Sequence, residues 1–129
     1  MKKTIFAIAM AAIVGLFAVS CSKTSLNTTK IIGTWKAQAE TMTYNGKTST
    51  HQVEEDIFWT FKADGSYSTT EGSMYSGTWL ITDDTLMLTV SEGSFSVTIN
   101  FNIDKLDSKN LILSGTFEGT YEKLEFTRS

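Results

Sequence analysis

The sequence predicts an all-β fold, an antiparallel up-and-down β-barrel of about eight strands over residues 31–129. After residue 30, turn-forming pairs recur at short intervals, the residues between them alternate between apolar and polar, and the helical period is absent. Short connections make neighbours in sequence neighbours in space. Closing such a meander into a barrel hides its apolar face and removes its exposed edges.

The composition limits the functions that the chain can carry. Its 129 residues are 41% hydrophobic, have a formal net charge of −3, and include one Cys, one His and no Pro. The length allows one domain. A single Cys excludes a disulfide framework within the chain and any metal site built from several cysteines. The acidic balance argues against a nucleic-acid binder, and we expect no cofactor and no metal ion.

Residues 1–20 have the pattern of a secretory signal peptide. Lys2 and Lys3 form a positively charged start, and residues 5–19 are an unbroken apolar or small-residue run. A membrane-spanning helix needs about 20 apolar residues, so this run is short for a permanent anchor. The positive start, the apolar middle and the small residues at the end together indicate a signal peptide.

The end of this segment, Ala18-Val19-Ser20-Cys21, resembles the lipobox of bacterial lipoproteins. The resemblance implies that Cys21 becomes the first residue of the mature chain and carries acyl groups such as palmitate. A thiolate is a strong nucleophile, which suits this modification, and several acyl chains attach a protein stably to a membrane. The alternative is a chance Cys near an ordinary cleavage site.

The residues after Cys21 indicate where in the cell the mature protein is located. Residues 21–129 contain 9 basic and 14 acidic side chains, a formal net charge of −5. Because this charge disfavours attraction to anionic lipids, the acyl groups must attach the protein to the membrane. Ser22-Lys23 stands where an acidic residue would otherwise follow the Cys, and by resemblance to lipoprotein sorting rules this implies the outer membrane. No acidic run follows, which favours the periplasm-facing side. Residues 22–30 are polar and predict a flexible tether of at most about 30 Å.

The predicted strands lie between pairs such as Asn45-Gly46 and Asp64-Gly65, which favour tight hairpin turns. Runs rich in Thr, Val, Ile and aromatic residues separate these pairs. The runs predict strands near 32–43, 47–53, 57–62, 66–70, 75–82, 85–91, 94–104, 110–117 and 120–127. Alternation is clearest in the seventh of them, where one face consists of Phe95, Val97, Ile99, Phe101 and Ile103.

Short motifs in a fixed order resemble a known family. Gly33-Thr34-Trp35 looks like the Gly-X-Trp that opens the lipocalin barrel, and Arg128 ends the last predicted strand. Residues 30–128 more closely resemble the short lipocalin-like lipoproteins of Bacteroidota, through 61–65 (Phe-X-X-Asp-Gly), 77–79 (Gly-X-Trp), 84–86 (Asp-X-Leu) and 126–128 (Phe-Thr-Arg). The resemblance implies a lipocalin-like barrel that is closed by a Trp35–Arg128 pair, in which the guanidinium stacks on the indole.

The resemblance leaves two functions open, because an eight-stranded barrel holds either its own side chains or one small ligand. In the first, the protein binds a small apolar ligand, and the expected lining residues are Trp59, Trp79, Phe95 and Phe101. In the second, the barrel is filled by its own side chains and serves as a protein-binding or scaffold module of the outer membrane. The identity of a protein partner is not predicted.

Catalytic chemistry is sparse, and we expect that the protein is not an enzyme. His51 lies in a polar segment without an evident nucleophile and is expected at the surface. Glu54-Glu55-Asp56 is expected as a solvated acidic loop, because consecutive strand residues point to opposite faces and no calcium-loop spacing follows. Phosphate-binding and nucleophile-elbow motifs are absent. A pair of carboxylates for glycoside hydrolysis, brought together from strands far apart in sequence, remains an open alternative.

Overall fold

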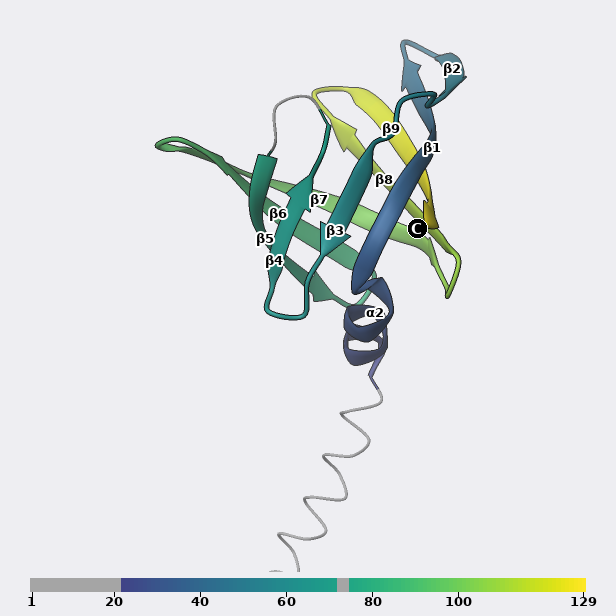
Figure 1. Cartoon of the computed structure of the whole chain (residues 1–129). Coiled ribbons are helices and arrows are strands. Elements are labelled where there is room, and N and C mark those ends of the chain that lie inside the picture. The colour runs from purple at the N-terminus through teal and green to yellow at the C-terminus, as the bar shows by residue number, and fades with distance from the viewer. Residues whose placement is uncertain (1–21, 72–74) are drawn as a thin grey trace, which may run out of the picture.

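One helix and nine strands follow one another in a computed structural model, which describes residues 22–71 and 75–129 (Figure 1). The predicted signal peptide at residues 1–20 and the predicted lipid-bearing Cys21 lie outside the described residues. The elements are α2 (Lys23–Ile31), β1 (Gly33–Tyr44), β2 (Lys47–Gln52), β3 (Phe58–Phe61), β4 (Ser66–Thr69), β5 (Tyr75–Thr82), β6 (Thr85–Glu92), β7 (Phe95–Leu106), β8 (Asn110–Phe117) and β9 (Thr120–Arg128).

The strands close into a barrel, which confirms the predicted fold class. Strands β3 to β9 pair in sequence order, and β9 returns to pair with β1 over a register that runs from Trp35–Arg128 to Thr43–Tyr121. The other edge of β1 pairs with β2 in one half and with β3 in the other half. Since β2 and β3 together occupy one place beside β1, the barrel has eight strand positions. Each strand begins and ends within two residues of its prediction.

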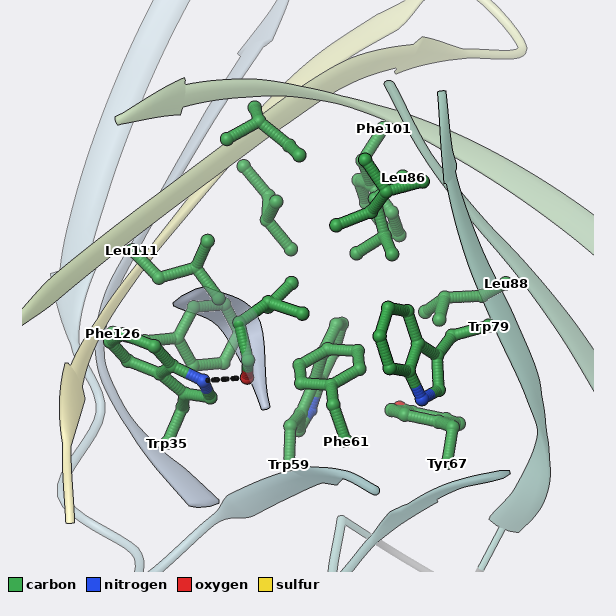
Figure 2. Close-up of a cluster of buried hydrophobic side chains, with 14 residues drawn as sticks. Trp35, Trp59, Phe61, Tyr67, Trp79, Leu86, Leu88, Phe101, Leu111 and Phe126 are labelled. Carbon is green, nitrogen blue, oxygen red and sulfur yellow. Dashed lines mark hydrogen bonds between the residues drawn. The ribbon is translucent and has the colours of Figure 1, made fainter. Parts of the chain in front are cut away.

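The half of the barrel nearest α2 is filled by its own side chains. Trp35, Phe61, Leu111 and Leu113 are fully buried there, with Trp79 and Leu86 among their neighbours in the core cluster. Figure 2 shows these aromatic and aliphatic side chains directed from opposite strands into the barrel. Leu111 and Leu113 share the inner face of β8, because every second residue of a strand points inward.

Trp35 and Arg128 close this end of the barrel, and the structure brings them into contact. The Cζ atom of Arg128 lies 4.2 Å from the centroid of the Trp35 ring. The guanidinium also donates hydrogen bonds to the backbone oxygens of Lys30, Ile32 and Ser108 at 2.6–2.9 Å. Gly33 has a φ of +137°, and a Cβ there would meet this guanidinium, so the glycine makes room for the pair.

The prediction of a flexible tether over residues 22–30 is wrong, because this segment forms helix α2 and packs on the barrel. The hydroxyl of Ser22 caps its first turn by accepting from the N–H of Ser25. Isolated helices this short are marginal in water, so tertiary contacts must stabilise it. The buried amide of Asn27 donates to the backbone oxygen of Asp83 at 2.7 Å, and Ile31 is fully buried.

Residues 22–129 form a self-contained unit, because every described strand pairs within this segment and the described core side chains are buried there. Helix α2 lies at one end of the barrel, and the hairpins β1–β2 and β8–β9 extend from the other (Figure 1). Within the described residues, no helix has the length and apolar character to cross a membrane.

Candidate functional site

A cavity of about 650 Å³ occupies the half of the barrel opposite α2. Small-molecule sites in proteins measure about 300–1,000 Å³, so the volume suits a small ligand. A smaller recess of about 450 Å³ adjoins it and shares Ile99, Phe101 and Glu122. The floor of the cavity is apolar and mostly aromatic, and consists of Trp59, Tyr67, Leu88, Phe101 and Phe126.

Trp59 is the centre of this floor. Its ring centroid lies 4.8 Å from that of Phe126, 5.5 Å from that of Tyr67 and 6.1 Å from that of Phe101. The contact with Tyr67 is edge-on, at an interplanar angle of 80°, a favourable arrangement for aromatic pairs. Rings held by several neighbours form a rigid surface, and Trp59 therefore presents a fixed wall to the cavity.

The indole N–H of Trp59 distinguishes it from the other two tryptophans. The Trp35 N–H donates to the backbone oxygen of Ile31 at 2.8 Å, and the Trp79 N–H donates to that of Lys62 at 2.9 Å. Trp59 is 7% exposed, yet no residue in the described part of the chain accepts a hydrogen bond from its N–H. A buried donor without a partner is costly and calls for an occupant such as water or a ligand.

The cavity opens at the end away from α2. Along β7 the side chains on the inner face become more exposed toward the β6–β7 hairpin: Phe101 is 5% exposed, Ile99 is half-buried, and Phe95 is 66% exposed. All three line the cavity. Phe95 therefore lies at the mouth, whereas Phe101 belongs to the floor.

Carboxylates and one imidazole surround the mouth. Glu40 and Glu122 come from neighbouring strands β1 and β9, and His51 lies opposite Glu40 on β2. The Nε2 atom of His51 is 3.6 Å from Oε1 of Glu40. Glu55 and Glu71 complete the charged lining of the described residues. The charged groups that line the cavity are therefore mostly acidic.

A β-bulge directs Glu40 into the barrel. The register between β1 and β9 shifts between Ala37 and Ala39. A bulge adds one residue to a strand and reverses which face the following residues occupy. Ala37 lies on the inner face before the shift, and Glu40 lies on the inner face after it, opposite Leu124.

The pKa of Glu122 is raised to about 7 from an ordinary 4.5. Burial in the barrel wall is the main cause, because it disfavours the charged form; Glu40, within hydrogen-bonding reach, and the charge of Glu71 act in the same direction. Glu122 therefore keeps its proton in a large part of the population near neutral pH, with the Glu40 carboxylate beside it. Deeper in the cavity, burial also raises the pKa of Tyr67, which keeps its hydroxyl neutral.

Three of the four predicted lining residues, Trp59, Phe95 and Phe101, lie on the cavity wall. The prediction is wrong for Trp79, which lies below the floor among the packed side chains. Its ring contacts Phe61 at 5.8 Å, and its N–H bonds to the chain at Lys62. Alternation gives the face of a residue but not its depth along the barrel.

Sequence reasoning missed Glu40 and Glu122, which are the polar centre of the mouth. Glu122 shares an alternating face with Leu124 and Phe126, a signal that marks an inward carboxylate on the last strand. Glu40 carries no such signal because of the bulge. His51 is largely exposed as predicted, with a side-chain exposure of 65%, and Glu55 extends the mouth. The described residues contain no group of three side chains placed to hold a metal ion.

Comparisons with known proteins agree with this architecture. A family model described as a lipocalin-like domain matches residues 31–113. No curated protein matches the chain. Among solved structures, the chain is similar to a lipocalin-like protein from Bacteroides uniformis, at 18% sequence identity and a TM-score of 0.57, over 78% of this chain and 99% of that one. At this identity the likeness concerns the fold alone.

Proposed function

Because this chain belongs to the family of lipocalin-like domains, we propose that it binds a small apolar ligand in the open half of its barrel. The observation that carries the proposal is the cavity of about 650 Å³ above the aromatic floor. One end of the barrel is filled by side chains and the other end holds this cavity, so the fold has room for a ligand without losing its core. Trp59, whose N–H has no acceptor among the described residues, is one of the residues that line this cavity.

Apolar burial supplies the affinity. Each methylene group that a ligand buries contributes about 0.8 kcal/mol before the cost of association. Affinity for a series of linear alcohols should therefore rise with chain length until the chain fills the space above Trp59. A plateau in this rise measures the usable depth of the cavity.

A filled cavity tests the proposal. Val90 is half-buried and lines the cavity from β6, whereas its neighbour Thr89 lies opposite Thr98 and bonds to its hydroxyl on the other face. We expect residues 22–129 to bind the neutral fluorophore N-phenyl-1-naphthylamine with a blue shift and a stoichiometry of one. Val90→Trp should abolish this binding by occupying the cavity, and Thr89→Trp should preserve it.

Two results would count against ligand binding in the barrel. One is the absence of saturable binding by a protein whose melting curve shows that it is folded. The other is equal binding by Val90→Trp and Thr89→Trp. Should Val90→Trp fail to fold, Val90→Phe fills less space and should weaken binding in proportion. If the folded protein binds neither the fluorophore nor the linear alcohols, the search moves to a protein partner, as expected of a scaffold module.

We further propose that the protein is a lipid-anchored protein of the cell envelope, held at Cys21 and facing the periplasm from the outer membrane. The lipobox-like segment supports the anchor. Helix α2 begins two residues after Cys21 and docks at the closed end of the barrel, so an anchor there would leave the mouth directed away from the lipid.

Labelling of cells with a palmitate analogue tests the anchor. Incorporation into the wild-type protein and none into Cys21→Ser is expected, together with outer-membrane fractionation and protection from protease added to intact cells. Labelling that persists in Cys21→Ser would refute the assignment of the anchor, and digestion in intact cells would refute the periplasm-facing orientation.

We propose that binding occurs without catalysis. Glu40 and Glu122 are the candidate carboxylate pair, but their carboxyl groups lie within hydrogen-bonding reach of each other. Glycoside hydrolases hold their two carboxyl groups about 5–9.5 Å apart to admit the sugar or water. Hydrolysis of aryl glycosides that disappears in Glu122→Gln would contradict this proposal.

A further inference from the structure

The described lining of the cavity carries charge of one sign. Apart from the neutral phenol of Tyr67, its ionisable groups are four carboxylates and one imidazole, with neither Lys nor Arg among the described lining residues; they are Glu40, Glu55, Glu71, Glu122 and His51. They come from different elements and converge on one opening. The charge pattern therefore belongs to the cavity and not to a single solvated segment.

Two of these carboxylates are part of the cavity wall itself. On β9, Glu122 lies on the same face as Leu124 and Phe126, which continue down to the floor. Four residues separate Glu122 from Phe126, about 13 Å along a strand, which is the length of an alkyl chain of about ten carbons. An elongated ligand whose apolar end rests on the floor would thus place its other end beside Glu122 and Glu40.

A feature independent of the carboxylates also points to an occupant. The Trp59 side chain is more than nine-tenths buried, lines the cavity, and has no acceptor for its N–H in the described part of the chain. The same donor is paired in both other tryptophans. A molecule in the cavity, with an acceptor in its body or with a water beside it, would complete this bond.

We propose that the cavity selects apolar amines, with the protonated nitrogen between Glu40 and Glu122 and the apolar body on the floor around Trp59. This inference rests on the proposed function and names its ligand class. An ammonium group donates to both carboxylates in a partly desolvated site, where such hydrogen bonds are strong. A fatty-acid carboxylate would instead lose its hydration beside groups of the same charge.

The proposal has a defined dependence on pH. Glu122, with a pKa of about 7, faces Glu40 on β1 and Glu71 after β4, and His51 on β2 faces Glu40. Below pH 7 Glu122 keeps its proton and the mouth is less negative; above pH 7 Glu122 is charged, while an alkylamine stays protonated. For a pKa near 7, the fraction of molecules in which Glu122 is ionised rises about tenfold between pH 6 and pH 8. The affinity for an amine should rise by up to that factor.

Three probes of equal chain length test the selectivity: decylamine, decanol and decanoate, each titrated by calorimetry into residues 22–129 below its aggregation concentration. We expect decylamine to bind at least tenfold more tightly than decanoate at pH 8, with decanol between them. Only the amine should gain affinity from pH 6 to pH 8. Glu122→Gln should reduce the amine-to-carboxylate ratio severalfold, and Glu40→Gln combined with it should remove the preference.

Glu125→Gln is the matched control, because it removes the same charge from β9 on the opposite face and should leave the ratio unchanged. Decanoate binding as tightly as decylamine would overturn the proposal, as would an equal loss in Glu122→Gln and Glu125→Gln. In either case, decanol binding that is still lost in Val90→Trp would show that the proposed function stands. Failure of all three probes would overturn both.

Discussion

Arg128 is expected to stabilise the closed end of the barrel, and Arg128→Ala tests this contribution. Its guanidinium donates three hydrogen bonds to backbone oxygens and lies 4.2 Å from the centre of the Trp35 ring. Two of the three acceptors, on Lys30 and Ile32, belong to the end of α2. The side chain thus joins the last strand, the first strand and the helix.

The magnitude follows from these four contacts. The Arg128 residue is exposed, so each contact is assigned about 0.5 kcal/mol, the low end of the range for hydrogen bonds and cation–π pairs. Arg128→Ala should therefore cost about 2 kcal/mol. For a domain of this size, that loss lowers the Tm by about 8 °C.

Urea unfolding of residues 22–129, followed by tryptophan fluorescence, measures the change in the free energy of unfolding. Arg128→Lys should recover less than half of the loss, because an ammonium cannot span three acceptors or stack on the indole. Lys47→Ala, which removes one positive charge from the exposed β1–β2 hairpin, should change stability by less than 0.5 kcal/mol. Equal stability of Arg128→Ala and the wild type would show that these four contacts do not stabilise the barrel.

Three further perturbations probe the helix, the sheet and the mouth. Asn27→Ala removes the buried hydrogen bond to Asp83 and should cost about 1–2 kcal/mol in urea unfolding. Gly77→Ala puts a Cβ against the backbone oxygen of Thr89, and by forcing two strands apart it should cost about 3 kcal/mol or prevent folding. The pKa of Glu122 is higher in the folded chain than in the unfolded chain, so its stabilising effect is complete below pH 4.5 and is lost as pH rises through 7. After a discount for partial exposure, the loss is about 1.5 kcal/mol, and Glu122→Gln should remove it from the pH profile of stability.

Two of these perturbations, at Gly77 and Glu122, have a matched comparison. Gly46→Ala adds a methyl group where no atom lies within 4 Å, so only the positive φ of +76° should cost stability, by about 1 kcal/mol. Glu125→Gln should keep the pH profile of the wild type. Wild-type stability of Asn27→Ala would contradict a stabilising bond to Asp83. Equal losses in Gly77→Ala and Gly46→Ala would contradict the close contact at Gly77. A pH profile of stability unchanged by Glu122→Gln would contradict the raised pKa of Glu122.

The sequence predicted the strands well because their signals are local. Asn45 and Gly46 both have positive φ in the β1–β2 turn, as the pair Asn-Gly requires. Likewise, Phe101 and Ile103 are buried on the face that alternation assigned to them. The Trp35–Arg128 contact came from resemblance, since residues so far apart in sequence leave no local trace of their pairing.

The remaining features depend on tertiary structure that local patterns do not encode. Helix α2 has polar residues with modest helix propensity, and the acceptor for Asn27 is 56 positions away at Asp83. The inward direction of Glu40 depends on a bulge, and the burial of Trp79 below the cavity depends on its level along the barrel axis. The empty half of the barrel is likewise a property of packing.

The proposed function requires that the open half of the barrel holds a small apolar ligand. Native mass spectrometry of residues 22–129 after incubation with a total envelope extract tests it most directly, with Val90→Trp as the filled-cavity control. We expect one discrete bound mass per protein in the wild type and none in Val90→Trp. A bare wild-type protein, under conditions in which a control carrier retains its lipid, would contradict it.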